Sequence, residues 1–516
     1  MNPSTRAVVA AITAFALSSA AFAASLGGRD PDRATLGKAV ASATIASKLA
    51  AGSRATRYTP PVPEDFSNLS WTEAFRRLNR KLAREYAFTK WKGINFTALY
   101  RKYHPLIARA EATNNRNGYY LTLRRYIHRL RDGHVRITEY PRVQQKLVGG
   151  GFGVVVMRLD NGRVVVTRVL NGSPAARAGI KRGARILKWR GRPIDEALAH
   201  TSTTLGPSQP TTARKRYEQL RYLVRAPIGD RVRVTFQNRG RATRIAALRA
   251  VDDHMKTLRL TNADDYVSKY GYPKRMVEHR IIGGNVGYVR VIAEVDLPAT
   301  LPGDHTPTLR QFRNAIREFI RAKVAGIIID VRSNSGGSDQ MVADFMASFY
   351  KHQAFYEYQN YIVPASGRFQ IWIADDVTGR YSHPGQGIHI KPLRQRFNGP
   401  VVALVDNGCI SSGEGVAMGI KRLPNGKVVG TYGTNGSFGM VGDGALMPGQ
   451  FVVDWPFGQS LDKQKIVQVD SRHGTGGVMP DVRVPLTLKN ALRSAAGRDV
   501  VLGHGLRTLR RMVRNR

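Results

Sequence analysis

The sequence predicts a multidomain α/β protein, and three observations lead to this fold class. The chain of 516 residues is too long for one hydrophobic core, so we expect several domains. Residues 149–251 are short β-rich runs separated by turn residues. From Ile281 onward, apolar strands alternate with amphipathic helices, which is typical of a layered α/β domain with buried parallel strands.

The first residues have the pattern of an export signal. Arg6 precedes an apolar run from Ala7 to Leu17, and small residues lead to Ala23. This pattern predicts a signal peptide over residues 1–23. A retained signal anchor is the alternative, but the run is shorter than the ~20 residues that span a bilayer. We therefore expect an exported protein, periplasmic or secreted.

The charge is strongly positive, with a formal net value of +43 that is carried mainly by arginine. Such a field favours anionic partners, for example an acidic envelope surface. Compositional bias is the simpler explanation, because basic residues do not alternate with aromatic ones and no nucleic-acid-binding motif occurs. No specific nucleic acid is expected as a partner. Cys409 is the only cysteine, so no internal disulfide can form.

Composition and periodicity divide the chain into segments. Ser70 and Glu73 have capping-box spacing at the start of an amphipathic helix, and residues 160–162 have the composition of a hairpin turn. The expected segments are a flexible lead-in (24–66), a helical domain (67–146), a β module (147–251), an α/β domain (252–490) and a basic tail (491–516). Within the β module, residues 212–224 are either a helix or an insertion. In the α/β domain we expect strands over 286–292, 324–331 and 401–405 and helices over 309–320, 338–350 and after Ser411.

Two glycine-containing segments of the β module suggest peptide binding. They are residues 150–154 (GGFGV) and residues 172–183 (GSPAARAGIKRG). Glycines let successive N–H groups turn toward a terminal carboxylate, and the following strand offers an edge to which a peptide can add. Together the segments resemble a PDZ domain, although Ala184 stands where that family usually has Asp. The residues that the resemblance implies for binding a substrate tail are Gly151, Phe152, Gly153 and Val154.

Two further motifs follow buried strands: residues 330–337 (DVRSNSGG) and residues 407–414 (NGCISSGE). A hydroxyl between a strand and a helix lies in the field of unpaired N–H groups, which suits a nucleophile. With the PDZ-like segments, the combination resembles the tail-specific, carboxyl-terminal-processing serine peptidases (peptidase family S41) over roughly residues 70–490. A serine at a helix start is by itself more often a cap, but the surrounding motifs favour Ser411 as the nucleophile.

This resemblance implies a layered ββα, crotonase-like catalytic core that hydrolyses peptide bonds through an acyl-enzyme on Ser411. It also implies that the backbone amides of Gly336 and Ser412 form the oxyanion hole. For Glu414, in the first turn of the helix, capping is the preferred interpretation. The implied partners are polypeptides with accessible C-termini, and the oligomeric state stays open.

Two bases can be considered for Ser411. One branch of the family uses a lysine beyond the nucleophile, but Ser437 stands at that place, and Lys421 or Lys427 would need an unusual arrangement. A branch resembling the tricorn core peptidase places a histidine ahead of the PDZ domain. Here that position has His134, and an imidazole near its ordinary pKa accepts a proton at neutral pH. The alternative for His134 is an ordinary hydrogen-bonded core or surface histidine.

An acidic residue should orient the imidazole. In the tricorn-like branch it comes from near the end of the domain, where Asp470 is the candidate; Asp132 is the second choice. Surface solvation is the simpler explanation for Asp470. No clustered ligands, P-loop or dinucleotide fingerprint occurs, so no cofactor is expected. The alternative function is a catalytically inactive peptide- or ligand-binding protein on the same scaffold.

Overall fold

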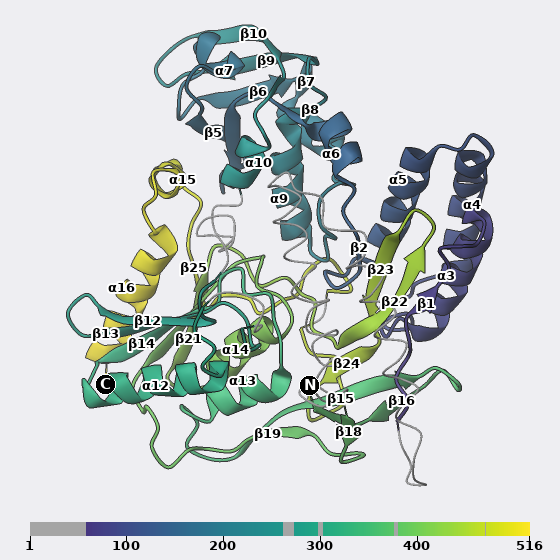
Figure 1. Cartoon of the computed structure of the whole chain (residues 1–516). Helices are drawn as coiled ribbons and strands as arrows, with labels where there is room; N and C mark the ends of the chain where they lie inside the picture. Colours follow the sequence, from purple (N-terminus) through teal and green to yellow (C-terminus); the bar gives the residue numbers. More distant parts are fainter. Residues whose placement is uncertain (1–57, 262–272, 298–302, 376–379, 470, 516) are drawn as a thin grey trace.

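The computed structural model describes residues 58–261, 273–297, 303–375, 380–469 and 471–515. The predicted signal peptide, most of the lead-in and Asp470 lie outside these residues. The described chain is a mixed α/β protein with a small β module, a group of helices and a larger layered region (Figure 1), as the sequence predicts. Within the described ranges, no helix combines the length and apolar character needed to cross a membrane.

The layered region is built around a six-stranded sheet in the described chain. Its strand order is β12-β13-β14-β20-β21-β25; β12 is antiparallel to β13 and the other neighbours are parallel. The strands are β12 (Val277–Ile282), β13 (Val286–Val291), β14 (Gly326–Asp330), β20 (Val401–Val405), β21 (Gly426–Gly430) and β25 (Val482–Arg483). Every residue of β14 and β20 is buried, which explains their uninterrupted apolar sequence. The predicted strands at 286–292, 324–331 and 401–405 are thereby confirmed.

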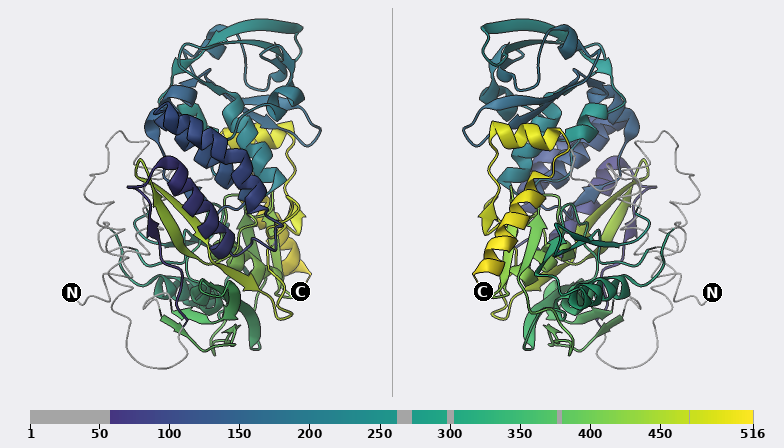
Figure 2. Two further views of the ribbon diagram at one scale, coloured as in Figure 1. Left: turned by 90° about the vertical axis from the view of Figure 1, so that its right-hand side faces the viewer. Right: turned by 90° about the vertical axis from the view of Figure 1, so that its left-hand side faces the viewer.

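Helices cover both faces of this sheet. One face carries α12 (Thr308–Arg321), α13 (Asp339–Met346) and α14 (Ser412–Lys421), which share its main apolar core. The other face carries α16 (Val500–Arg514), whose Leu509 is fully buried. Figure 2 shows α16 running along the sheet. The basic C-terminal segment, for which a helix was considered possible, contains α16, whose arginines are exposed. Its apolar side packs on the sheet, which was not predicted.

The N-terminal helices share a core with a distant hairpin. They are α3 (Trp71–Glu85), α4 (Phe96–Ala112) and α5 (Arg116–Ile127), and the hairpin is β22 (Val441–Met447) with β23 (Phe451–Pro456). Phe75 and Trp455, both fully buried, belong to one cluster. The hairpin joins β1 (Glu64–Asp65) and β2 (Arg136–Ile137) in one sheet. The helices expected as a separate domain thus depend on the C-terminal half of the chain, and Ser70 caps α3 as predicted.

The β module has its own core and a sheet of order β10-β9-β6-β5-β4, with β7 added to β6. Its elements are β4 (Val154–Arg158), β5 (Val164–Val169), α7 (Pro174–Arg177), β6 (Arg185–Trp189), β7 (Arg192–Pro193), α8 (Ile194–Ala199), α9 (Thr212–Leu223), β9 (Arg231–Gln237) and β10 (Thr243–Arg249). The β4–β5 hairpin at residues 160–162 is confirmed, and residues 212–224 are mainly a helix.

The remaining elements support these regions. They are η1 (His128–Leu130), α6 (Pro141–Val148), β3 (Gly150–Gly151), β8 (Arg225–Ala226), β11 (Val251–Asp252), α10 (Lys256–Thr261), β15 (Ala354–Val363), β16 (Arg368–Ile371), β17 (Ile373–Asp375), β18 (Arg380–Ser382), β19 (Ile388–Ile390), β24 (Gly458–Leu461) and α15 (Leu488–Ala495). Strand β15 pairs with β16, β19 and β24 in a second sheet of the layered region.

Candidate active site

Ser411 lies in a strained turn between β20 and α14. Its backbone has φ 59° and ψ −136°, a region that non-glycine residues rarely adopt. Such a conformation costs of order 1–3 kcal/mol and persists only where the surroundings impose it, as at many active sites. The Ser411 side chain makes no capping hydrogen bond to α14. Capping therefore does not explain this serine.

Gly336 packs directly against Ser411. Strands β14 and β20 are parallel neighbours, so the loops after them meet at one edge of the sheet. Gly336 has φ +84°, and a Cβ atom there would lie 2.4 Å from the Cβ and 3.0 Å from the Oγ of Ser411. The Gly336 N–H donates to Oδ1 of Asn334 at 2.8 Å. One predicted oxyanion donor is thus adjacent to the nucleophile but hydrogen-bonded to a side chain of its own loop.

The Asn334 side chain is held in turn by Glu294. Its amide nitrogen donates to Oε1 of Glu294 at 2.8 Å and to the carbonyl of Val291 at 3.0 Å. Burial raises the pKa of Glu294 to about 8, although the Asn334 hydrogen bond opposes this shift. Glu294 is therefore mainly neutral at pH 7. The sequence singled out neither residue, because their roles follow from a contact between two loops.

Ser412 is the first residue of α14, so its N–H has no acceptor within the helix. Its hydroxyl lies 2.7 Å from the carbonyl of Gly337 and 2.9 Å from Oδ1 of Asp339. These contacts tie the side chain to the loop after β14. The role of the Ser412 backbone N–H as an oxyanion donor stays a prediction.

The side chain of Glu414 is hydrogen-bonded to the loop of residues 434–437. Its buried carboxylate accepts hydrogen bonds from the Thr434 hydroxyl and from the backbone N–H groups of Gly436 (2.9 Å) and Ser437 (2.8 Å). Burial raises the pKa of Glu414 to about 7, and these hydrogen bonds limit the shift. Glu414 is the third residue of α14 and also interacts with the backbone N–H of the N-cap residue Ser411, as the interpretation as a helix cap expects. Its hydrogen bonds to the loop at residues 434–437 are a further role that the sequence did not predict.

Ser437 connects the nucleophile to the turn that carries His134. Its carbonyl accepts the N–H of Ser411 at 3.0 Å, and its hydroxyl accepts the N–H of Gly133 at 2.8 Å. A Cβ atom on Gly133 would lie 2.7 Å from Cδ1 of Ile410, the residue before the nucleophile. The structure thus brings the predicted base and nucleophile segments together. In the sequence, Ser437 was noticed only as the place of a missing lysine.

His134 is fully buried beside Asp132. Its Nδ1 lies 3.7 Å from Oδ1 of Asp132, and neither ring nitrogen has a hydrogen-bond partner among the described residues. Burial lowers the pKa of His134 to about 4, and the Asp132 carboxylate offsets only part of that shift. The imidazole is therefore neutral at pH 7, as a general base must be.

Asp132 is held from several sides. Its Oδ1 accepts the backbone N–H of His134 at 3.0 Å, and its Oδ2 accepts the hydroxyl of Tyr86 at 2.8 Å and the ammonium of Lys92 at 3.2 Å. Burial tends to raise the pKa of Asp132, but Lys92 and the other contacts lower it below its usual value. Asp132, the second choice from the sequence, is the acid that contacts the His134 turn in the described chain.

The two lysines considered as bases lie elsewhere. Lys421 donates to the carbonyl of Met479 at 2.8 Å and to Oδ1 of Asp481 at 2.7 Å, at the far end of α14. Lys427 is exposed on β21. Neither lysine contacts Ser411, so the geometry favours the histidine.

The predicted tail-binding residues differ in their surroundings. Gly151 lies in β3, the middle strand between β11 and β8, where the side chains of Asp253 and Arg225 fill the space beside its Cα. This is at odds with the prediction for Gly151, because its main chain is paired inside a sheet.

The other three tail-binding residues adjoin an edge. The Phe152 side chain is buried in the module core, Gly153 has φ +81° against Ser173, and Val154 begins β4, the last strand of its sheet. The role of Phe152, Gly153 and Val154 stays a prediction.

The sequence and the fold of the chain resemble those of known proteins. Residues 285–484 match the family model for peptidase family S41, so this part of the chain is a peptidase family S41 domain.

One relative of similar sequence and two structures of similar fold can be compared with the chain. The chain is 25% identical over 462 residues to a tricorn protease homolog 2 of Streptomyces coelicolor; the match covers 85% of this chain and 32% of the relative. The chain thus spans about a third of that relative's length. The fold is similar to that of mature CPAF (TM-score 0.61, 15% identity, 86% of this chain and 98% of that one) and of mature CPAF complexed with lactacystin (0.60, 15%, 87% and 99%).

Proposed function

We propose that this chain is an exported serine endopeptidase that cleaves polypeptides through an acyl-enzyme on Ser411. One observation carries the proposal: a strained serine outside any capping role, pressed against a glycine backbone and joined through Ser437 to a turn with a buried, neutral histidine. Export rests on the N-terminal sequence alone. Binding of substrate C-termini rests on the β module and its edge strand β4.

The proposed chemistry proceeds in two halves. His134 accepts the Ser411 proton as Oγ attacks the peptide carbonyl, and then gives that proton to the leaving amine. Water then attacks the ester, His134 accepts its proton, and Ser411 recovers a proton as the carboxylic acid leaves. Asp132, whose Oδ1 lies 3.7 Å from Nδ1 of His134, orients the ring and stabilises its charged form.

The oxyanion of each half would be stabilised by backbone N–H groups. The Ser412 N–H is at the start of α14, and the Gly336 N–H becomes available once it leaves Asn334. The ring of His134 must also approach Ser411, because no hydrogen bond joins the two in the described part of the chain. Substrate binding would supply both small rearrangements, since catalytic hydrogen bonds often form only in the complex.

A catalytically inactive peptide-binding protein is the second candidate. The occupied N–H of Gly336 and the unpaired imidazole of His134 favour it. On this alternative, Asn334 fills the oxyanion site permanently.

Covalent labelling separates the two candidates. The purified protein would be treated with a fluorophosphonate probe and the modified residue located by peptide mass spectrometry, with Ser411→Ala as the control. We expect label on Ser411 and Ser411-dependent cleavage of an unfolded polypeptide. Absence of label, with an unfolded polypeptide still bound, would establish the inactive alternative.

A further inference from the structure

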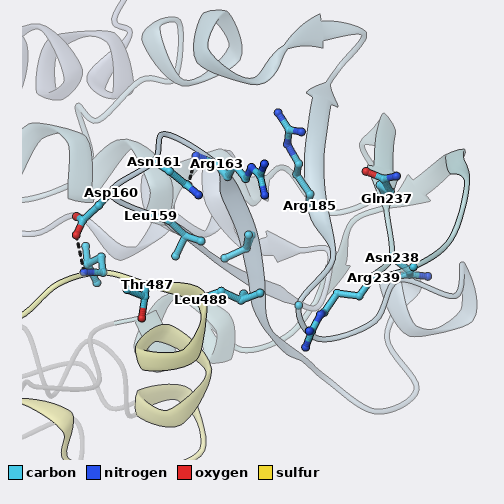
Figure 3. Close-up of a pocket in the computed structure, with 14 residues that line it drawn as sticks. Leu159, Asp160, Asn161, Arg163, Arg185, Gln237, Asn238, Arg239, Thr487 and Leu488 are labelled. Carbon is cyan, nitrogen blue, oxygen red and sulfur yellow. Dashed lines mark hydrogen bonds between the residues drawn. The ribbon is translucent and has the colours of Figure 1, made fainter.

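A basic pocket lies between the β module and the segment that leads into α15. It encloses about 510 Å³, within the range of small ligand sites. Three arginines line it from separate parts of the module: Arg163 after the β4–β5 turn, Arg185 at the start of β6 and Arg239 after β9. Figure 3 shows these side chains around Leu159 and Leu488. None of the residues of the proposed active site lines this pocket.

The charge of the pocket is not neutralised from within the protein. Arg163, Arg185 and Arg239 are exposed and form no ion pair in the described chain. The one carboxylate of the lining, Asp160, accepts two hydrogen bonds from Arg483 (2.5 and 2.9 Å) and one from the N–H of Leu486 (2.9 Å). The side chains of Arg163, Arg185 and Arg239 can therefore form ion pairs with a bound anion.

The floor of the pocket is apolar. Leu159 and Val165 are buried in a small cluster with Ala491 of α15, and Leu488 packs against this cluster. A ligand that fits both features carries negative charges for the arginines and an apolar group for the floor. An inorganic anion or a sugar-phosphate backbone would leave the floor uncovered, whereas an acidic peptide with apolar side chains covers both.

We propose that this pocket is a docking site for an acidic, apolar-containing segment of a polypeptide, separate from the edge of β4 and from Ser411. The inference rests on the proposed peptidase function for the source of the ligand, namely a substrate chain. Arginine suits this role because its planar guanidinium pairs with carboxylates in a defined geometry. Such docking would favour substrates with an acidic region away from the cleaved bond.

The test measures peptide binding to Ser411→Ala protein, so that cleavage does not interfere. A fluorescent peptide rich in Glu and Leu, amidated at its C-terminus to prevent tail recognition, is titrated by fluorescence anisotropy. The pocket variant combines Arg163→Gln, Arg185→Gln and Arg239→Gln. The control combines Arg231→Gln, Arg233→Gln and Arg249→Gln, which remove the same charge from exposed positions. Arg231 lies six residues from the pocket residue Gln237 along β9, or about 20 Å at about 3.3 Å per residue.

We expect the pocket variant to bind the peptide roughly tenfold more weakly, because three arginine–carboxylate contacts of modest strength are lost. The control variant should change by less than about twofold. A peptide with Gln in place of Glu should bind the parent protein weakly, and so should an acidic peptide with Ser in place of Leu. Thermal unfolding of both variants checks that the fold is retained.

Two outcomes would overturn the proposal. Equal weakening in both variants would show a general effect of net charge. A single-stranded oligonucleotide that loses binding in the pocket variant while the peptide does not would assign the pocket to nucleic acid. Fluorophosphonate labelling of the parent protein tests the proposed peptidase function by itself, so failure of that function and failure of the docking site are told apart.

Discussion

The two halves of the candidate active site are held in different ways. The Ser411 turn follows a strand of the central sheet, and backbone hydrogen bonds fix it to Ser437, which Glu414 holds in place. The His134 turn follows the N-terminal helices, and its ring is packed without any hydrogen bond among the described residues. The nucleophile half is thus set by the sheet, whereas in the base half hydrogen bonds hold Gly133 and Asp132 but the His134 ring is held by packing. This difference suggests that the base side moves when substrate binds.

The largest expected effect comes from removing the proposed base. His134→Ala should lower kcat/KM for polypeptide cleavage by about 10³-fold, because Ser411 loses its proton acceptor. Initial rates on an unfolded polypeptide and the rate of fluorophosphonate labelling measure this effect.

The matched control for His134→Ala is Lys421→Met. Lys421 is paired with Asp481 away from the site, so cleavage should stay within about twofold of the parent rate. Loss of activity in the lysine variant, with His134→Ala still active, would assign the base to Lys421 instead of His134.

The next effect concerns the nucleophile half. Gly336→Ala should lower the labelling rate of Ser411 by about 10²-fold, because the new methyl group would lie 2.4 Å from the Ser411 Cβ and displace it. The measurement is the labelling rate together with thermal unfolding.

Gly367→Ala isolates the backbone cost of that change. Gly367 also has a positive φ, but its Cβ position is open. Both variants should lose about 1 kcal/mol of stability from the left-handed backbone, and only Gly336→Ala should lose labelling. Similar labelling in the two variants would mean that the Gly336–Ser411 contact does not matter.

The pH dependence of cleavage reports on the base half. Only the neutral imidazole accepts a proton, so activity falls as pH drops through the pKa of His134. Since burial lowers that pKa to about 4, the acid limb should lie near pH 4 rather than near 6.5. Activity at pH 5 should therefore stay close to that at pH 7 where the fold persists, as followed by circular dichroism. An acid limb near 6.5 would mean that the ring becomes solvated in the working enzyme.

The sequence predicted much of the nucleophile half. The motifs at 330–337 and 407–414 follow strands that are parallel neighbours, and parallel order brings the ends of such strands to one edge. Strand order therefore brings the two loops together, whereas the contact between Gly336 and Ser411 also depends on the conformation of the loop after β14.

The base half and the hydrogen bonds between the loops around Ser411 were harder to predict. Three hydrogen-bonded contacts illustrate this: Asn334 with Gly336, Glu414 with residues 434–437, and Ser437 with Gly133. They depend on which donor meets which acceptor in the folded loops, and the periodicity of the sequence contains no such information. The same holds for the β22–β23 hairpin, which completes the core under the N-terminal helices. The pairing of Gly151 with strands β11 and β8 was not predicted. The glycine-rich sequence of residues 150–154 fits a peptide-binding loop as well as it fits a paired strand.

The smallest effect concerns the link between the two halves. Ser437→Ala removes the acceptor of the Gly133 N–H but leaves both main-chain contacts of Ser437, to Ser411 and Glu414, in place. One hydrogen bond contributes about 1 kcal/mol, so kcat should fall by roughly fivefold with little change in KM. Labelling of Ser411 at alkaline pH, where the base matters less, should change by a smaller factor. Ser437→Thr keeps the hydroxyl and should restore most of the rate. If the threonine variant is as slow as the alanine variant, the hydroxyl does not join the two halves, and the base turn is positioned by packing alone.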